Sequence, residues 1–128
     1  MLEDNFTIIN ETKGRLPSLP FVKVKDKILG KKYELDLIFV DEKKIHSLNK
    51  TYRKVDSPTD ILSFPLSKNS GEIFFCLKKA KIKAKDFERE FENFVSFLFV
   101  HGCVHLLGYD HGTKMENKEK IYRKYFRI

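Results

Sequence analysis

The sequence predicts an α+β fold: a short mixed sheet packed against helices, with a histidine-bearing helix in the core. Two patterns predict this, because segments of alternating polarity intermix with helical segments, and one long apolar helical segment ends in histidines. With 128 residues, 41% of them hydrophobic, the chain is long enough for one domain spanning residues 1–128. No apolar run is long enough to cross a bilayer, so we expect no membrane partner.

Four segments are predicted as strands. The segment 33–40 alternates leucine and phenylalanine with acidic residues before becoming apolar on both sides. The others are residues 6–10, residues 60–66, closed by Pro65, and residues 71–77, which follow the turn at 68–71. The last two segments lie close enough in the chain to form a hairpin.

The first two helices are predicted from their end signals. Ser18 is a candidate cap for a helix that runs to about residue 29 and stops at Gly30, although residues 21–24 also fit a strand. Asp41 is the candidate cap of a helix that reaches about residue 54. Its predicted core stripe is Ile45, Leu48, Tyr52 and Val55.

The long helix is the one that carries the histidines. Asp86 is its candidate N-cap, and a final helix is expected over 113–125. The apolar stripe of the histidine helix recurs at i, i+4, i+7 and i+11, and the same stripe continues onto His101 and His105. The stripe consists of Phe87, Phe91, Phe94 and Leu98. Both imidazoles are thus expected on a buried face, where unpaired polar groups cost several kcal/mol.

A third histidine follows the helix after a glycine. Gly108 can end the helix at positive φ and return the chain, so that His111 meets His101 and His105. Three neutral imidazoles around one divalent ion leave a fourth position open, which is typical of a catalytic zinc. A single histidine on an apolar face is usually an ordinary core residue, but three within eleven residues favour a metallohydrolase.

The spacing of these histidines also fits the metzincin proteases, His-x-x-x-His-x-x-Gly-x-x-His. Those enzymes need a glutamate directly after the first histidine as general base, and this chain has Gly102 there. Met115 follows His111 too closely to form the separate methionine turn of that family. A protease is therefore disfavoured.

The chain is basic, with 25 Lys and Arg against 18 Asp and Glu and a formal net charge of +7. This charge suits a polyanion such as nucleic acid, although a lysine-rich proteome explains it equally well. The lysines between 78 and 85 either contact RNA or form a solvated loop face. Acidic residues near the N-terminus argue against a signal peptide, so we expect a cytoplasmic protein.

Neither cysteine has the spacing of a zinc-binding pair. Cys103 lies roughly 200° around the helix from His101 and points away from the proposed metal. Both Cys76 and Cys103 are expected to be reduced core thiols. His46, outside the histidine motif, is expected to be an exposed helix residue.

Three blocks of the sequence, in order, resemble the YbeY family of bacterial metal-dependent endoribonucleases. The segment His-Gly-x-x-His-Leu-Leu-Gly-Tyr-Asp-His at 101–111 resembles the family signature. Residues 48–53 and 59–65 are similar to its block of asparagine and arginine before Thr-Asp-Val-Leu-Ser-Phe-Pro. Gly-Glu-Ile at 71–73 takes the place of the usual Gly-Asp-Ile, a departure that keeps the charge.

The resemblance implies that His101, His105 and His111 bind one metal ion. Zinc is expected, and other divalent transition metals suit the same ligands. Arg53 matches the family's functional arginine, and a guanidinium is suited to bidentate phosphate contact and to charge developing at phosphorus. For this arginine the alternative is a surface cation on a basic helix.

Three further residues are candidates for the site. Asn49 is a candidate substrate-binding residue that orients Arg53 or a substrate phosphate, or else a solvated helix position. Ser63 is a second candidate for substrate binding, because it lies on a strand expected to border the cleft. The alternative is that Ser63 is mainly structural. Asp110 either holds an imidazole through its second nitrogen or is simply a turn residue.

The resemblance implies an endoribonuclease that cleaves internal phosphodiesters of single-stranded RNA in small-subunit rRNA maturation and ribosome quality control. The expected partners are rRNA, the ribosome or its small subunit, and assembly factors. Either metal-activated water or the ribose 2′-hydroxyl is the attacking group. The rival hypothesis is a non-catalytic ribosome-assembly and RNA-binding factor with a structural metal, because no general base is evident after His101.

Overall fold

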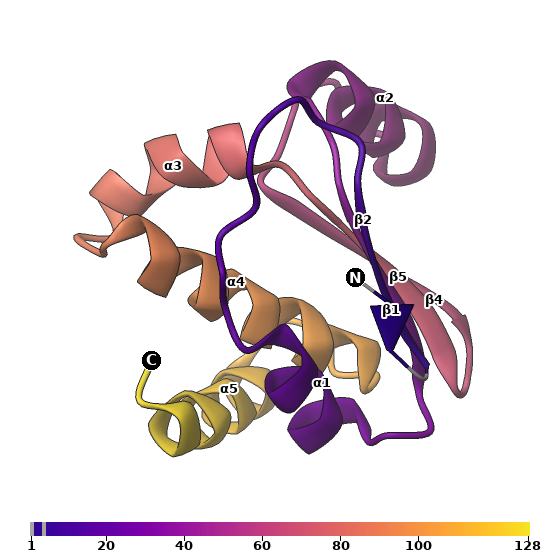
Figure 1. The fold of residues 1–128 in the computed structure, drawn as a ribbon, viewed down its shortest axis with the longest axis vertical. Helices are drawn as coiled ribbons and strands as arrows, with labels where there is room; N and C mark the ends of the chain where they lie inside the picture. The colour runs from indigo at the N-terminus through magenta and orange to yellow at the C-terminus, as the bar shows by residue number, and fades with distance from the viewer. Residues whose placement is uncertain (1, 4) are drawn as a thin grey trace.

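The computed structural model describes residues 2–3 and 5–128, and their arrangement is shown in Figure 1. One mixed sheet carries the strands in the order β1-β2-β3-β5-β4. The strands are β1 (Leu2–Glu3), β2 (Phe6–Asn10), β3 (Glu34–Phe39), β4 (Ile61–Ser67) and β5 (Ser70–Phe75). Strands β2, β3 and β5 are parallel, while β1 and β4 run antiparallel to their neighbours. The predicted α+β fold and the β4–β5 hairpin are confirmed.

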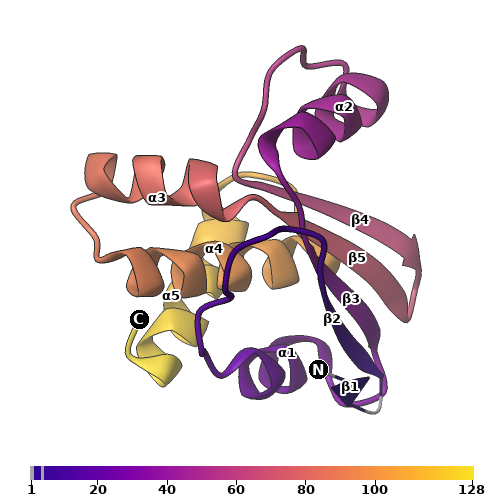
Figure 2. The same cartoon turned by 45° about the horizontal axis from the view of Figure 1, so that its top comes forward.

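Helices flank this sheet on both faces. They are α1 (Phe21–Leu29), α2 (Glu42–Arg53), α3 (Leu77–Asp86), α4 (Phe91–Leu106) and α5 (Thr113–Phe126). Helices α1 and α4 pack on one face, and α3 and α5 pack on α4 (Figure 2). Over the described residues, no helix combines the length and apolar composition needed to cross a membrane.

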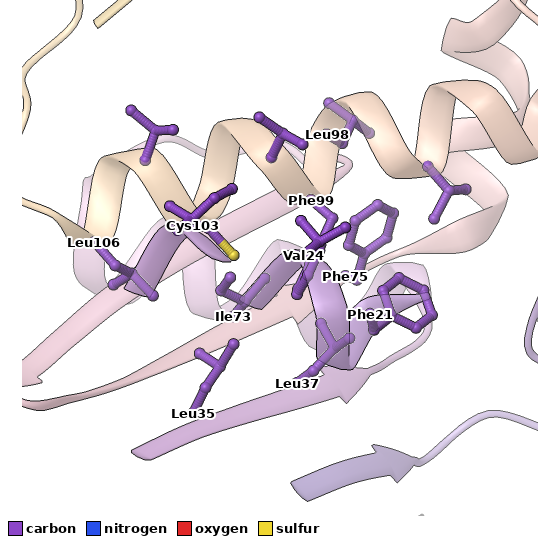
Figure 3. Packing of buried hydrophobic residues seen from close by; sticks show 14 of the residues in the cluster. Phe21, Val24, Leu35, Leu37, Ile73, Phe75, Leu98, Phe99, Cys103 and Leu106 are labelled. Atoms are coloured by element: carbon purple, nitrogen blue, oxygen red, sulfur yellow. The ribbon is translucent and has the colours of Figure 1, made fainter. Parts of the chain in front are cut away.

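The main core lies between the sheet and α4 (Figure 3). Alternate residues of β3, Leu35, Leu37 and Phe39, point into it, whereas Ile38 belongs to a smaller cluster on the opposite face. In that cluster Ile45 of α2 is fully buried. Because α4 is packed between the sheet and two helices, its C-terminal end is held in a fixed position relative to β4.

Two of the predicted helix starts are wrong. Helix α1 begins after Pro20 rather than at Ser18, because the residue before a proline is disfavoured in helical conformation. Asp86 does not cap the histidine helix, since it is the last residue of α3, and α4 begins after Glu90. Asp41 does cap α2, because its carboxylate accepts a hydrogen bond from the Lys44 N–H at 2.8 Å.

The loop expected around the lysines between 78 and 85 is helix α3. Its buried residues are Ala80 and Ala84, whose small side chains gave little apolar signal among the lysines. Tyr52 of α2 is exposed, and so is Val55, which lies beyond the end of the helix at Arg53, so the predicted core stripe is wrong beyond Leu48.

Strand β4 ends at Ser67, one residue past the expected end at Leu66, and it runs through Pro65. A proline is accommodated there because β4 is the edge strand, and the register shifts between residues 65 and 67. Cys76 and Cys103 are buried free thiols, as predicted. Burial raises the pKa of the Cys103 thiol, which keeps it protonated.

Candidate metal centre and RNA cleft

The three histidines meet at the C-terminal end of α4. His101 and His105 lie one turn apart on this helix, and Gly108 ends it at a φ of 102°, as predicted. The returning chain stacks His111 against both, with ring centroids 5.4 Å from His101 and 5.7 Å from His105. His101 and His105 are half-buried, not on a closed core face as expected, and His111 is exposed. The imidazoles are therefore open to a ligand.

Gly102 allows α4 to lie close to β4. A Cβ at this position would be 3.0 Å from Cδ1 of Ile61, 3.1 Å from Oγ of Ser63 and 3.2 Å from Cδ1 of Ile73. The Ser63 hydroxyl instead donates to the Gly102 carbonyl at 3.4 Å. The position after the first histidine thus faces the sheet and has no room for a glutamate side chain, which explains why a metzincin arrangement cannot form.

An open cleft of about 480 Å³, here called the histidine cleft, lies between α2, β4 and the end of α4. All seven site residues predicted from the sequence line it. They are Asn49, Arg53, Ser63, His101, His105, Asp110 and His111. Segments up to about 60 positions apart in the chain therefore converge on one surface.

Arg53, in the last turn of α2, is tied to the edge strand. Its Nη2 donates to the Ser63 carbonyl at 2.5 Å, and the guanidinium carbon lies 5.1 Å from the Phe64 ring centroid. The bond to Ser63 uses one of the five N–H donors of the guanidinium. The side chain is exposed but oriented, so its other donors are held beside the histidines.

Asn49 is buried, which excludes the solvated position considered for it. Its side-chain Nδ2 donates to the Ser57 carbonyl at 2.9 Å, and its main-chain carbonyl accepts from the Val55 N–H at 3.2 Å. These bonds fix the loop that connects α2 to β4. Asn49 therefore shapes the rim of the histidine cleft, and a contact with substrate stays a prediction.

Glu119 of α5 is a site residue that the sequence analysis missed. Its Oε1 lies 3.0 Å from Nδ1 of His101 and 3.7 Å from Nη1 of Arg123, and the residue is only 5% exposed. The signal was present, because Glu119 falls one turn after the buried Met115 on the same face of α5. Asp110, predicted for such a role, is exposed at the cleft, and its role stays a prediction.

His105 lies in a different environment from His101. Burial lowers the pKa of His105, and the nearby positive charges of His111, Arg53 and His101 lower it further. Its Nδ1 is buried without a hydrogen-bond partner among the described residues. A neutral imidazole with an unpartnered nitrogen is a competent metal ligand.

The donor set fits zinc, since it consists of three neighbouring imidazoles, one of them with an orphaned buried nitrogen. The rings are stacked rather than converged on one point. Over residues 2–3 and 5–128, no group of three His, Cys, Asp or Glu side chains is arranged to hold a metal ion. Metal binding by these histidines therefore stays a prediction from their chemistry and proximity.

Comparison with known proteins identifies the family. The model of the family described as "Endoribonuclease YbeY" matches residues 16–126 of this chain. The chain belongs to the YbeY family. The resemblance predicted from the three sequence blocks is thus confirmed.

Several YbeY relatives match over most of the chain. A protein of Acholeplasma laidlawii named Endoribonuclease YbeY is 46% identical over 89 residues, which is 66% of this chain and 65% of that protein. A Ureaplasma parvum protein of the same name is 36% identical over 133 aligned positions, covering 92% of this chain and 85% of its own length. The relatives are named as nucleases, which agrees with the predicted enzyme class.

The YbeY fold is also found in a solved structure. The solution structure of TM1509 from Thermotoga maritima is 30% identical, with a TM-score of 0.64. The match covers 95% of this chain and 91% of the Thermotoga chain. The match to the Acholeplasma relative spans just under two thirds of that protein's length.

Proposed function

We propose that this protein is a metal-dependent endoribonuclease that cleaves single-stranded RNA in small-subunit rRNA maturation and ribosome quality control. The observation that carries the proposal is the convergence of Arg53 with three histidines at one open cleft. An arginine tethered beside a set of imidazoles is suited to hydrolysis of a phosphodiester, because one part holds the phosphate and the other can hold a metal.

His101, His105 and His111 would hold zinc, which when bound supplies a Lewis acid for hydrolysis of the phosphodiester. Glu119 accepts a hydrogen bond from Nδ1–H of His101, which fixes its ring and leaves Nε2 as the free nitrogen. Arg53 binds a non-bridging phosphate oxygen and stabilises charge that develops there. Ser63 holds Arg53 in place through its carbonyl oxygen.

The charge of the chain supports this proposal. The net charge of +7 favours an RNA substrate, with rRNA of the small subunit and its assembly factors as partners in the cytoplasm. Binding to RNA should then weaken as salt is raised.

A non-catalytic ribosome-assembly factor is the second candidate. It is favoured by the stacked arrangement of the imidazoles, which are not converged as ligands, and by the glycine where a general base would stand. In that case the histidines would serve only to order the 107–112 loop.

Cleavage of a labelled precursor rRNA by zinc-loaded protein tests the two candidates. We expect His105→Ala and Arg53→Ala to abolish cleavage while circular dichroism shows an intact fold. His46→Ala and Arg15→Ala are matched controls, because both residues lie outside the histidine cleft. Equal cleavage by all five proteins would indicate a contaminating nuclease and favour the assembly factor.

A further inference from the structure

A second hollow of about 430 Å³ adjoins the histidine cleft. The two share three wall residues, Ile61, His101 and His111, so they meet at these residues and are together called the groove. The histidine cleft extends toward α2, whereas the second hollow lies between α3, α4 and α5, and Figure 1 shows α2 and α5 at opposite ends of the molecule. The histidines therefore stand near the middle of the groove.

An endonuclease needs such a groove, because a strand cleaved internally continues on both sides of the scissile phosphate. Arg53 accounts for only one side of the histidines. The second hollow is within the size range of small-ligand sites, and it begins at the same two imidazoles.

One wall of the second hollow offers an aromatic surface. Phe87 follows α3 directly and is 48% exposed, although its ring centroid lies 5.1 Å from that of Phe94 and 5.9 Å from that of Phe97. Its ring is thus anchored by two neighbours and still open to solvent. An anchored, exposed ring is suited to stacking with a nucleobase of any identity.

Among the charged side chains that the structure describes in this wall, one lysine or arginine is free for a phosphate. Lys83 lies 3.5 Å from Asp60, and Arg123 lies 3.7 Å from Glu119, so two of its cations already face carboxylates. Lys120 is exposed and has no ion pair among the described residues. It is therefore the cation most available to a strand that enters the hollow.

We propose that the second hollow binds the nucleotide next to the scissile phosphate of a single-stranded RNA, with its base stacked on Phe87 and its backbone phosphate on Lys120. This proposal rests on the proposed function, since it takes the histidines as the point of cleavage. Binding there is independent of base identity, because the ring and the ammonium group contact features that every nucleotide has.

Fluorescence anisotropy with the full-length, zinc-loaded protein tests this assignment. The probes are single-stranded RNAs of increasing length with phosphorothioate linkages, which keep the backbone charge and slow hydrolysis, and strand integrity is checked on a gel. The variants are Phe87→Leu, which keeps the apolar packing, and Lys120→Ala. The control is Lys124→Ala, one turn further along α5 and outside both hollows.

For wild type we expect affinity to rise in a step at the length that fills both hollows. Phe87→Leu and Lys120→Ala should each lower the affinity for strands that fill both hollows roughly tenfold, without changing the affinity for the shortest strand that binds. Lys120→Ala should also lower the salt dependence of long-strand binding by about 0.7 in log–log slope, the loss of one contact. Lys124→Ala should leave both quantities unchanged.

The assignment is overturned if wild-type affinity shows no such step, or if the two variants weaken short and long strands equally or weaken neither. Unmodified RNA, run in parallel, separates this outcome from a failure of the proposed function. A protein that shows the length step but cleaves nothing contradicts the nuclease and retains the second hollow. A protein that cleaves but lacks the step retains the nuclease and contradicts the second hollow.

Discussion

Glu119 Oε1 lies 3.0 Å from Nδ1 of His101, although the two residues belong to different helices. The carboxylate is almost fully buried, and Arg123 at 3.7 Å balances its charge. A carboxylate that holds the outer nitrogen of a ligand histidine fixes its tautomer and raises its basicity. The position of α5 thus sets the orientation of His101, one of the three proposed metal ligands.

Glu119→Gln should weaken zinc binding by about 10- to 100-fold, because a neutral amide lacks the negative charge of the carboxylate that accepts the hydrogen bond from His101. Competition with a chromophoric chelator measures the affinity directly, without relying on enzyme activity. Glu116→Gln, an exposed position on the same helix, is the matched control. Equal affinities of Glu119→Gln and wild type would show that the contact is merely structural.

Arg53→Lys separates catalysis from binding. Lysine keeps the charge but cannot reproduce the forked contact, so the single-turnover cleavage rate should fall by about 10²–10³-fold. The affinity for RNA should change little, as measured by filter binding. A rate within threefold of wild type would contradict a catalytic role of the Arg53 guanidinium, and Arg15→Lys controls for the substitution itself.

The sequence predicted the features that depend on local signals. Asp41 as N-cap and Gly108 as the helix end follow from motifs within a few residues. The grouping of Arg53 with the histidines, about 50 residues further along the chain, followed from the family resemblance instead. The beginnings of α1 and α4 were misplaced, because Pro20 and the separate helix α3 decided them.

Glu119 was missed for a different reason. It lies 18 residues beyond His101, and only the packing of α5 against α4 brings the two side chains together. The same packing forms the second hollow. Features that arise between helices have no signature within either one, beyond a charged residue on a buried face.

The environment of His105 predicts a pH dependence of stability. Burial and neighbouring cations lower its pKa in the folded state below the ordinary value of 6.5. The unfolded chain therefore takes up a proton that the folded chain resists, so the free energy of unfolding should fall as pH drops below about 6.5. Denaturant unfolding of chelator-treated protein between pH 7 and pH 5 measures this. A His105→Asn variant should lose part of the slope, and an unchanged slope would contradict the assignment.

Gly102→Glu would introduce the glutamate that a metzincin needs. The packing around Gly102 predicts that this substitution disrupts the fold instead. The new side chain would meet Ile61, Ser63 and Ile73, all within 3.2 Å of its Cβ, and would place a carboxylate among buried apolar groups. We expect the free energy of unfolding to fall by at least about 3 kcal/mol. Gly14→Glu is the control, because the nearest atom to a Cβ there is 3.9 Å away, and it should change stability by less than about 0.5 kcal/mol. A stable Gly102→Glu protein that hydrolyses peptides would mean that α4 can move away from β4, and that the histidines serve a protease as readily as a nuclease.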